Sequence, residues 1–599
     1  MNKHIFRKLT FVHLAALFFF APALLSAQNG TPVAPLQHRL EQVYFDEPYQ
    51  LGGQQLYAMG PLMDLYRQNN FQPLWTEQKK IVELGMAVIA AAEEGLIPAD
   101  YHLATINAAL SGEQTPEGND YTLDRDILFS DALILLGEHI LHGKVDRRDV
   151  EEKEGLAAGP RPEVDVDFYL NALRSGRIAA AMRERAPQHP NYQILKEGLA
   201  LYKQRAGQGG WPTVPQGPSL KPGMQGERVA ALRQRLAASG DLPGTLVGGE
   251  LYDPDLTAAV QQFQSRHGLD TDGLTGKNTL AAMNVSVEER IQQIRANLER
   301  TRWILHDLPP SAVLVDIAGF EVHYRHNNET LWRSKVMVGE PYNQTPVFRS
   351  AITYLVLNPT WTIPPGMLKN ETIPKILKDP GYLQKENLKV YDLQGKPVNA
   401  AGIEWRQYLS KGFPYLLRQD AGPDNALGRI KFMFPNPYHV YLHDTPSKSL
   451  FGRNSRALSH GCIRVQSPLD LGRMILANDL GNTITDERID TILESGKTTG
   501  ISLKSPLPVF LLYTTAKVEA DGAVSFSPDV YGRDAAVIEA LNLPPRPLLQ
   551  KPLLMEAVQE DTPAEPAATH GEPADPGQPA PDQGADRQNS PANTTQPGA

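Results

Sequence analysis

Apolar residues recur at helical spacing over a long block in the first part of the chain, at roughly residues 45–210. Two clear segments are Ile81 to Glu94, followed by Gly95, and Leu128 to Leu141, followed shortly by Gly143. A helical period with a glycine at its end predicts a helix closed by a glycine cap. No motif for chemistry lies in this block, and we expect a helical scaffold domain.

A linker rich in glycine and proline separates this block from a compact unit at residues 220–284. The unit carries Val-x-x-Leu-x-x-x-Leu from Val229 and Phe-Gln-x-x-x-Gly-Leu-x-x-Asp-Gly-x-x-Gly-x-x-Thr from Phe263. These patterns predict a small three-helix core, with Asp272-Gly273 as a turn. The unit resembles a peptidoglycan-binding type 1 domain, and a plain helical spacer is the alternative.

From Ser311 the period changes to short strands separated by glycine and asparagine turns. We expect a mostly antiparallel β-sandwich or half-barrel within residues 311–500. The stretch at 364–423 is too long for an ordinary connection, so we expect an inserted lid. The whole chain is then a multidomain α+β protein. The expected strands are 312–317, 320–324, 332–338, 354–357, 429–434 and 439–442.

Two further apolar runs follow, at 509–513 and 524–526, joined through Asp521-Gly522. We expect them to pair as a final hairpin, within an extension of the same domain at 501–545. Beyond Val558 the chain has no Val, Leu, Ile, Met, Phe, Tyr or Trp. A segment of that composition cannot bury a core, so we expect a disordered tail at 551–599.

The N-terminus has the pattern of a Sec-type secretory signal at residues 1–27. Lys3, Arg7 and Lys8 precede an apolar run, and Ser26-Ala27 supplies the small residues of a cleavage site. We therefore expect a periplasmic protein cleaved after Ala27. Leu25 is larger than usual for its position, so an uncleaved anchor is the alternative, and only then would the protein sit on a membrane.

Composition narrows the class of partner. The 599 residues are 41% hydrophobic and 21% charged, with a net charge of −10. No basic stripe or Lys/Arg cluster is present, which argues against nucleic acid as a partner. The length implies roughly three or four domains rather than one.

Cys462 is the only cysteine, and it lies in Ser459-His460-Gly461-Cys462-Ile463-Arg464. One thiol cannot form an intramolecular disulfide and is a poor metal site alone, so we expect neither a metal nor a cofactor. The alternative is a buried cysteine that acts as a small hydrophobe. The polar neighbours are wrong for a core strand, and an oxidising compartment threatens free thiols, so we interpret Cys462 as a nucleophile.

His443 ends a predicted strand upstream of that motif, and we expect it to be the base. An imidazole beside the thiol would raise the thiolate fraction and later protonate the leaving amine. Its second nitrogen needs an orienting partner, either the backbone carbonyl of Asp444 or Thr445. His460 is the rival base, but it is so close to Cys462 in the chain that we assign it a pocket-shaping role.

Two more residues of the motif suit acyl transfer. Gly461 leaves the backbone open, so the N–H groups of Gly461 and Cys462 could stabilise a tetrahedral oxyanion. Arg464 could hold a substrate carboxylate, and a structural ion pair is an equal alternative.

The spacing from His443 to the Ser459–Arg464 motif resembles the signature of the YkuD-type L,D-transpeptidases. The resemblance is to large periplasmic members with a scaffold domain, a peptidoglycan-binding module and an inserted lid, and covers about residues 45–545. Many members have Gly or Ser where this chain has Asp444. The resemblance implies that Cys462 is the nucleophile and His443 the catalytic histidine. Residues expected to border the cleft are Trp361, Asn425, Gly428 and Tyr441.

The resemblance also implies a reaction. An acyl-enzyme forms at diaminopimelate of a tetrapeptide stem, D-alanine leaves, and the amine of a second stem attacks to give a 3→3 cross-link. It further implies peptidoglycan stem peptides as substrate, carbapenems as reagents for the thiol, and other cell-wall synthesis enzymes as partners. An L,D-carboxypeptidase, a transferase that attaches a lipoprotein to peptidoglycan, and a non-catalytic wall-binding protein stay open as alternatives.

Overall fold

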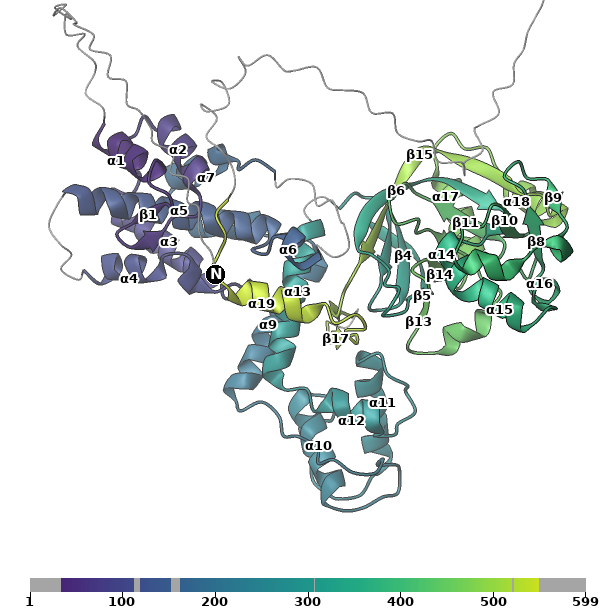
Figure 1. The fold of residues 1–599 in the computed structure, drawn as a ribbon. Coiled ribbons are helices and arrows are strands. Elements are labelled where there is room, and N and C mark those ends of the chain that lie inside the picture. The colour runs from purple at the N-terminus through teal and green to yellow at the C-terminus, as the bar shows by residue number, and fades with distance from the viewer. Residues whose placement is uncertain (1–33, 113–118, 152–161, 306–307, 520–521, 549–599) are drawn as a thin grey trace, which may run out of the picture.

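The computed structural model describes residues 34–112, 119–151, 162–305, 308–519 and 522–548. The expected signal peptide at 1–27 and the expected tail at 551–599 lie outside these residues. Figure 1 shows a helical body in purple and blue, a smaller helical body below it, and a body with a large sheet in teal and green.

The helical body is built around two long helices. α5 (Asn119–His142) begins before the predicted Leu128, and its residues 132–136 are fully buried. α13 (Val287–Leu305) packs against α9 (Pro190–Gly207) and connects this body to the sheet. The other elements are α1 (Pro35–Tyr44), β1 (Gln50–Leu51), β2 (Gln54–Gln55), α2 (Met59–Gln68), α3 (Gln78–Ala90), α4 (Leu103–Ser111), α6 (Arg147–Glu151), α7 (Val166–Ser175) and α8 (Ile178–Arg185).

The smaller body has the three predicted helices: α10 (Glu227–Ser239), α11 (Pro254–Arg266) and α12 (Lys277–Met283). Val260, Phe263 and Leu280 are buried in its core, as their spacing predicts. The Asp272-Gly273 turn is also confirmed, because Gly273 has a φ of 71°, which a glycine adopts readily.

The large sheet has nine strands in the order β13-β5-β14-β12-β11-β6-β15-β3-β4. β4 also pairs with the first half of β5, so the sheet closes into a ring, whereas we expected a β-sandwich or a half-barrel. Most pairs are antiparallel, as predicted. The strands are β3 (Ala312–Asp316), β4 (Glu321–His326), β5 (Glu329–Gly339), β6 (Phe348–Leu357), β11 (Ile430–Met433), β12 (Leu442–His443), β13 (Ala457–Ser459), β14 (Ile463–Val465) and β15 (Thr499–Leu512), with α17 (Pro468–Asn478) and α18 (Asp486–Ser495) after β14.

The predicted hairpin between 509–513 and 524–526 is wrong. Residues 509–512 belong to β15, which pairs with β6 and β3 inside the large sheet. β17 (Val524–Phe526) instead pairs with β16 (Ala516–Val518). The β16–β17 hairpin buries Ala516, Val524 and Phe526 in the core of the helical body. An apolar run specifies that a strand is buried but not its partner, and β15 finds two better partners on its own sheet.

The insertion has its own hydrophobic core, formed by Ile363, Leu368, Ile373, Ile376, Leu388, Val390 and Leu417. Its four strands form a separate sheet in the order β7-β10-β8-β9. We call residues 364–423 the lid. Its elements, with β7 just before it, are β7 (Trp361–Thr362), α14 (Pro365–Met367), α15 (Ile373–Lys378), α16 (Tyr382–Lys385), β8 (Leu388–Tyr391), β9 (Pro397–Val398) and β10 (Leu416–Gln419).

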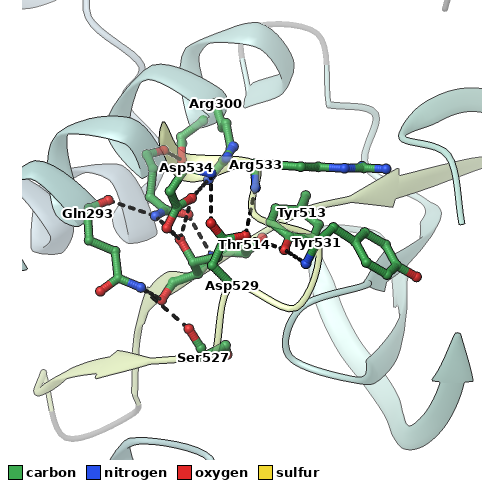
Figure 2. A network of polar contacts seen from close by, with 12 residues as sticks. Gln293, Arg300, Tyr513, Thr514, Ser527, Asp529, Tyr531, Arg533 and Asp534 are labelled. Atoms are coloured by element: carbon green, nitrogen blue, oxygen red, sulfur yellow. Dashed lines mark hydrogen bonds and ion pairs between the residues drawn. The ribbon is translucent and has the colours of Figure 1, made fainter. Parts of the chain in front are cut away.

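After the hairpin, α19 (Asp534–Asn542) packs against α13. A polar network at this junction is drawn in Figure 2. Asp534 accepts hydrogen bonds from Arg300 on α13 and from Thr515, at 2.5 and 2.8 Å. Asp529 accepts one from the hydroxyl of Tyr513 at 2.5 Å. These bonds tie the C-terminal segment to both the helical body and the sheet. Within the described residues, no helix combines the length and apolarity needed to cross a bilayer.

Candidate active site

The candidate site lies on one face of three adjacent strands, β11, β12 and β14. Side chains alternate between the two faces of a strand, and Phe432, Leu442 and Ile463 point into the core of the ring. The residues next to them on each strand, Lys431, His443 and Arg464, therefore lie on the opposite face of the sheet. In the register of the sheet, His443 lies beside Arg464 on β14 and opposite Lys431 on β11. Alternation and pairing thus collect residues from separate parts of the sequence on one face.

His443 is buried and oriented by the backbone of its neighbour. Its Nδ1 lies 2.5 Å from the carbonyl oxygen of Asp444, one of the two partners expected from the sequence. A carbonyl only accepts, so Nδ1 carries the proton and Nε2 is left with its lone pair. Burial, with Arg464 next, lowers the pKa of His443 to about 3, so the ring is neutral at physiological pH. A neutral imidazole held in this tautomer is a base.

Cys462 is half-buried in the turn just before β14. Because β12 and β14 pair in parallel, Cys462 lies next to Tyr441, the residue just before β12. Burial raises the pKa of the thiol, and hydrogen bonds from the backbone and hydroxyl of Tyr441 partly offset that rise. The positive charges of Arg464 and Lys431 also favour the thiolate. The resting site therefore combines a protonated thiol with a neutral histidine.

The loop before Cys462 is held in one conformation by hydrogen bonds. Gly461 has a φ of 110°, which L side chains rarely adopt. Its N–H donates to Ser459 Oγ at 3.1 Å, so that N–H is already used, contrary to our expectation of an oxyanion donor. The N–H of Cys462 has no acceptor in the parts of the chain that are described. Of the two backbone N–H groups expected to stabilise an oxyanion, that of Cys462 is therefore the one still free to donate.

A second set of bonds braces the same loop from the C-terminal side. Thr345 Oγ donates to the carbonyl of Gly461 at 2.8 Å, which fixes the peptide plane that carries the Cys462 N–H. The N–H of Thr345 in turn donates to Tyr531 Oη at 3.2 Å. Tyr531 belongs to the network of Figure 2, because its own N–H donates to Tyr513 Oη at 2.8 Å. Bonds therefore run from α13 through the C-terminal segment to the cysteine loop.

The imidazole of His460 is bonded to the lid. Its Nε2 lies 2.8 Å from Glu371 Oε1 in the lid, and the side chain is about a third exposed at 37%. Its ring nitrogen is therefore engaged with the lid, which agrees with the interpretation of His460 as a residue that shapes the pocket. The structure brings His443, not His460, onto the face shared with Arg464 and Lys431.

Arg464 makes no ion pair or hydrogen bond within the described residues, so the ion-pair alternative is wrong there. Its Nε is buried and unbonded. The side chain as a whole is half-buried, and a guanidinium partly removed from water without an acceptor leaves room for an anion.

The other residues expected at the cleft differ in their placement. Tyr441 lies beside the thiol, and its ring centroid is 5.5 Å from that of His443. Trp361 packs against the core of the lid. The amide of Asn425 is bonded within its own loop, to the carbonyls of Gln419 and Asp420 and to the N–H of Leu427. These contacts favour a loop-closing role for Asn425 over contact with a substrate.

Gly428 has no room for a side chain. A Cβ there would lie 2.4 Å from the carboxylate of Asp444, whose oxygen accepts from the N–H of Arg429 at 2.8 Å. The glycine thus leaves room for the carboxylate of Asp444, which the N–H of Arg429 holds in place. Asp444 is also the residue whose carbonyl orients His443.

Sequence reasoning missed Lys431, Thr345, Tyr531 and Glu371. Lys431 could have been found, because a lone lysine between Ile430 and Phe432 is the outward position of an apolar strand. The other three lie far from the motif, and only the tertiary structure brings them to it. No group of three or more His, Cys, Asp or Glu in the described parts of the chain could hold a metal ion.

The site therefore brings together a free thiol, a neutral histidine and an open backbone N–H, next to the lid. Residues 310–482 match the YkuD family, described as the L,D-transpeptidase catalytic domain. Residues 60–199 match a scaffold domain, and residues 225–283 a proposed peptidoglycan binding domain. The chain thus carries a region that matches the YkuD-type L,D-transpeptidase catalytic domain, preceded by regions that match a scaffold domain and a peptidoglycan binding domain.

A Haemophilus influenzae protein, named as a proposed L,D-transpeptidase, is 38% identical over 246 residues. The match covers 41% of this chain and 49% of that protein, so it spans about half the length of the relative. Among solved structures, an L,D-transpeptidase from Stackebrandtia nassauensis is 14% identical, with 50% of this chain and 96% of that one covered and a TM-score of 0.19. An L,D-transpeptidase from Mycobacterium smegmatis is 13% identical, with 34% of this chain and 58% of that one covered and a TM-score of 0.15. Similarities this loose carry no argument about the site.

Proposed function

We propose that this protein is an L,D-transpeptidase that forms 3→3 cross-links in periplasmic peptidoglycan through a thioester on Cys462. The observation that carries the proposal is the pairing of β12 with β14. It sets the oriented, neutral His443 in the strand next to the one that follows Cys462. The remaining steps follow from what each group can donate or accept.

His443 Nε2 takes the thiol proton as Cys462 attacks the carbonyl of diaminopimelate in the donor stem. Negative charge develops on the carbonyl oxygen, and the open N–H of Cys462 can donate to it. The imidazolium then gives its proton to the nitrogen of the leaving D-alanine, which leaves a thioester. The amine of a second stem attacks that thioester, loses a proton to His443, and releases the thiol.

The lid supports this reaction because a thioester must meet an amine and not water. Its contact with the cysteine loop, Glu371 to His460, would let the lid respond to what occupies the site. We propose that the lid is a mobile cap that orders over the donor stem.

The peptidoglycan-binding module contributes substrate rather than chemistry in this proposal. A cavity of about 1220 Å³ lies between the module and the sheet body, lined by Leu269 and Lys277 on one side and Phe320 and Ser455 on the other. Asn454, eight residues before Cys462, donates to Asp270 of the module at 2.7 Å. A peptidoglycan strand bound in this cavity would raise the local concentration of stem peptides near the thiol.

The test uses a carbapenem and a stem substrate with the full chain. Intact mass should show one covalent adduct per protein, and mass spectrometry of the products should show 3→3-linked stems. Cys462→Ala should give neither. An adduct without linked stems but with tripeptide release would make the protein an L,D-carboxypeptidase. Absence of both products from the folded wild-type protein would overturn the proposal.

The role of the module has a separate test. Deletion of residues 220–284 should reduce cross-linking of polymeric wall more than that of soluble stems. An equal loss on both substrates would mean that the module is a structural part of the enzyme.

A further inference from the structure

Two cations flank His443 without an acidic partner. Lys431 lies opposite it on β11, and Arg464 lies beside it on β14. Within the described residues, neither side chain makes a hydrogen bond or an ion pair. The Nζ of Lys431 is 5.5 Å from the ring centroid of Tyr441, and the Nε of Arg464 is buried without an acceptor.

Some buried cations elsewhere in the described residues are paired with carboxylates, whereas Arg235 and Arg456 are bonded to backbone carbonyls. Arg302 lies 2.8 Å from Glu299, and Arg185 lies 2.7 Å from Glu138. Pairing is the usual condition for a charge removed from water, because an unpaired buried charge is costly. Lys431 and Arg464 are half-buried on one face of the candidate active site, without an acceptor among the described residues, and are therefore placed to receive an anion.

The other charged groups near His443 do not supply that anion. The carboxylate of Asp444 accepts from Lys448 Nζ at 2.5 Å and from the N–H of Arg429 at 2.8 Å, so it is already engaged. Lys448 adds a third positive charge that acts on His443. Glu371 is bonded to His460. The remaining neighbours, Tyr441 and Cys462, are neutral at rest.

We propose that Lys431 and Arg464 form a binding site for a carboxylate of the donor stem. This inference rests on the proposed function. The guanidinium fork of arginine matches a carboxylate in shape, and the lysine adds a point charge beside it. Two carboxylates of a stem are candidates, that of the leaving D-alanine and the free carboxylate of diaminopimelate.

A carboxylate at this position would also change His443. In the empty site, burial and the neighbouring cations hold the pKa of His443 at about 3, which disfavours its taking the thiol proton. A bound carboxylate offsets the two cations and raises that pKa. The histidine would then become a stronger base only when a donor stem is in place, so an empty site would keep its thiol protonated.

The first experiment does not depend on the proposed reaction. Cys462 is the only cysteine, so every alkylation reports on it. The rate with iodoacetate, an anion, is divided by the rate with neutral iodoacetamide, so the thiolate fraction cancels. We expect this ratio to be roughly 10-fold or more higher in the folded protein than in the chain unfolded in urea, the effect of a charged hydrogen bond. An equal ratio in both states would overturn the site.

Variants then identify the residues. Lys431→Met and Arg464→Met should each lower the folded ratio toward the unfolded one, whereas Lys431→Arg and Arg464→Lys should retain most of it. Lys497→Met removes an exposed lysine remote in sequence from the motif and should change nothing. A ratio that is unchanged in both Met variants would assign the anion preference elsewhere. Should a Met variant fail to fold, Lys431→Gln or Arg464→Gln takes its place.

The second experiment names the carboxylate. Donor stems are compared in three forms: unmodified, with D-alaninamide at the end, and with diaminopimelate amidated. The form that loses roughly 10-fold or more in kcat/KM identifies the bound group, and the loss should shrink toward none in Lys431→Met. Equal rates for all three would overturn the carboxylate site. No transfer from any stem, with the iodoacetate preference intact, would instead count against the proposed function alone.

Discussion

The face of the ring that carries Cys462 and the lid differ in how they are held. β12 and β14 are hydrogen-bonded to strands on both sides, and the cysteine loop is braced further by Thr345 and the C-terminal segment. The lid has its own small core and sheet, and reaches the cysteine loop through the bond between Glu371 and His460. Under the proposed function, the difference would separate two tasks. Groups that transfer protons need fixed geometry, whereas a cover over the site would have to admit a polymer.

Substitution of Cys462 should have the largest effect on the face of the ring that carries it. Cys462→Ala and Cys462→Ser should abolish 3→3 cross-linking, because no other cysteine can replace it. Product analysis by mass spectrometry measures the loss, and circular dichroism with thermal unfolding serves as the control for folding. Turnover near the wild-type rate in Cys462→Ala would sink the mechanism.

Substitution of the two histidines tests the two regions side by side, because His443 lies on the face of the sheet and His460 bonds to the lid. His443→Ala should lower the acylation rate by about 10² to 10⁴, the usual contribution of general acid–base catalysis. His460→Ala should cost much less, because its ring nitrogen bonds to the lid. Single-turnover kinetics with a carbapenem measure both. A dead His460→Ala beside an active His443→Ala would reverse the assignment.

The pH dependence tests whether the resting thiol is protonated. Burial raises the pKa of Cys462 above its ordinary value, and His443, with a pKa of about 3, is neutral from pH 5 upward. Alkylation by iodoacetamide should then rise about tenfold per pH unit, roughly 100-fold from pH 6 to pH 8, with a midpoint above that of an ordinary thiol. A flat plateau between pH 5 and 7 would reveal a thiolate–imidazolium pair and contradict this account.

Removal of the lid tests the movable region. When a short linker replaces residues 364–423, iodoacetamide should still alkylate Cys462, while stem-to-stem transfer falls by roughly 10²-fold as positioning is lost. In the intact protein, hydrogen exchange of the lid should slow when the acyl-enzyme forms. Glu371→Gln is the milder variant, since it keeps the lid and weakens only its bond to His460. Normal transfer by the lidless protein would rule out gating.

The smallest expected effect concerns the brace behind the cysteine loop. Thr345→Val should slow acylation by about 10-fold, because it frees the peptide that presents the Cys462 N–H. It should leave alkylation by iodoacetamide unchanged, since that reaction develops no oxyanion, and Thr345→Ser should restore acylation. Thr353→Val loses a hydroxyl bond on the same sheet and is the matched control. Equal loss in both assays would mean that Thr345 only supports the fold.

Periodicity and motif predicted much of the fold. The helices of the helical body and the module, most strands of the ring and the insertion all appear near their predicted positions. The partner of 509–512 was predicted wrongly, because pairing depends on which edge is free in three dimensions. The same holds for the closure of the ring through β4 and β5.

The sequence by itself determined which chemistry is available: a single thiol at Cys462, His443 at the end of a predicted strand, and a glycine, Gly461, directly before the thiol. Only the tertiary structure decided which groups meet. It places Lys431 and Arg464 on either side of His443 with no ion pair among the described residues, and it bonds His460 to the lid. The physical reason is that residue identity sets what a side chain can donate, accept or carry. Strand register and burial set which partners remain within reach, and thereby its charge.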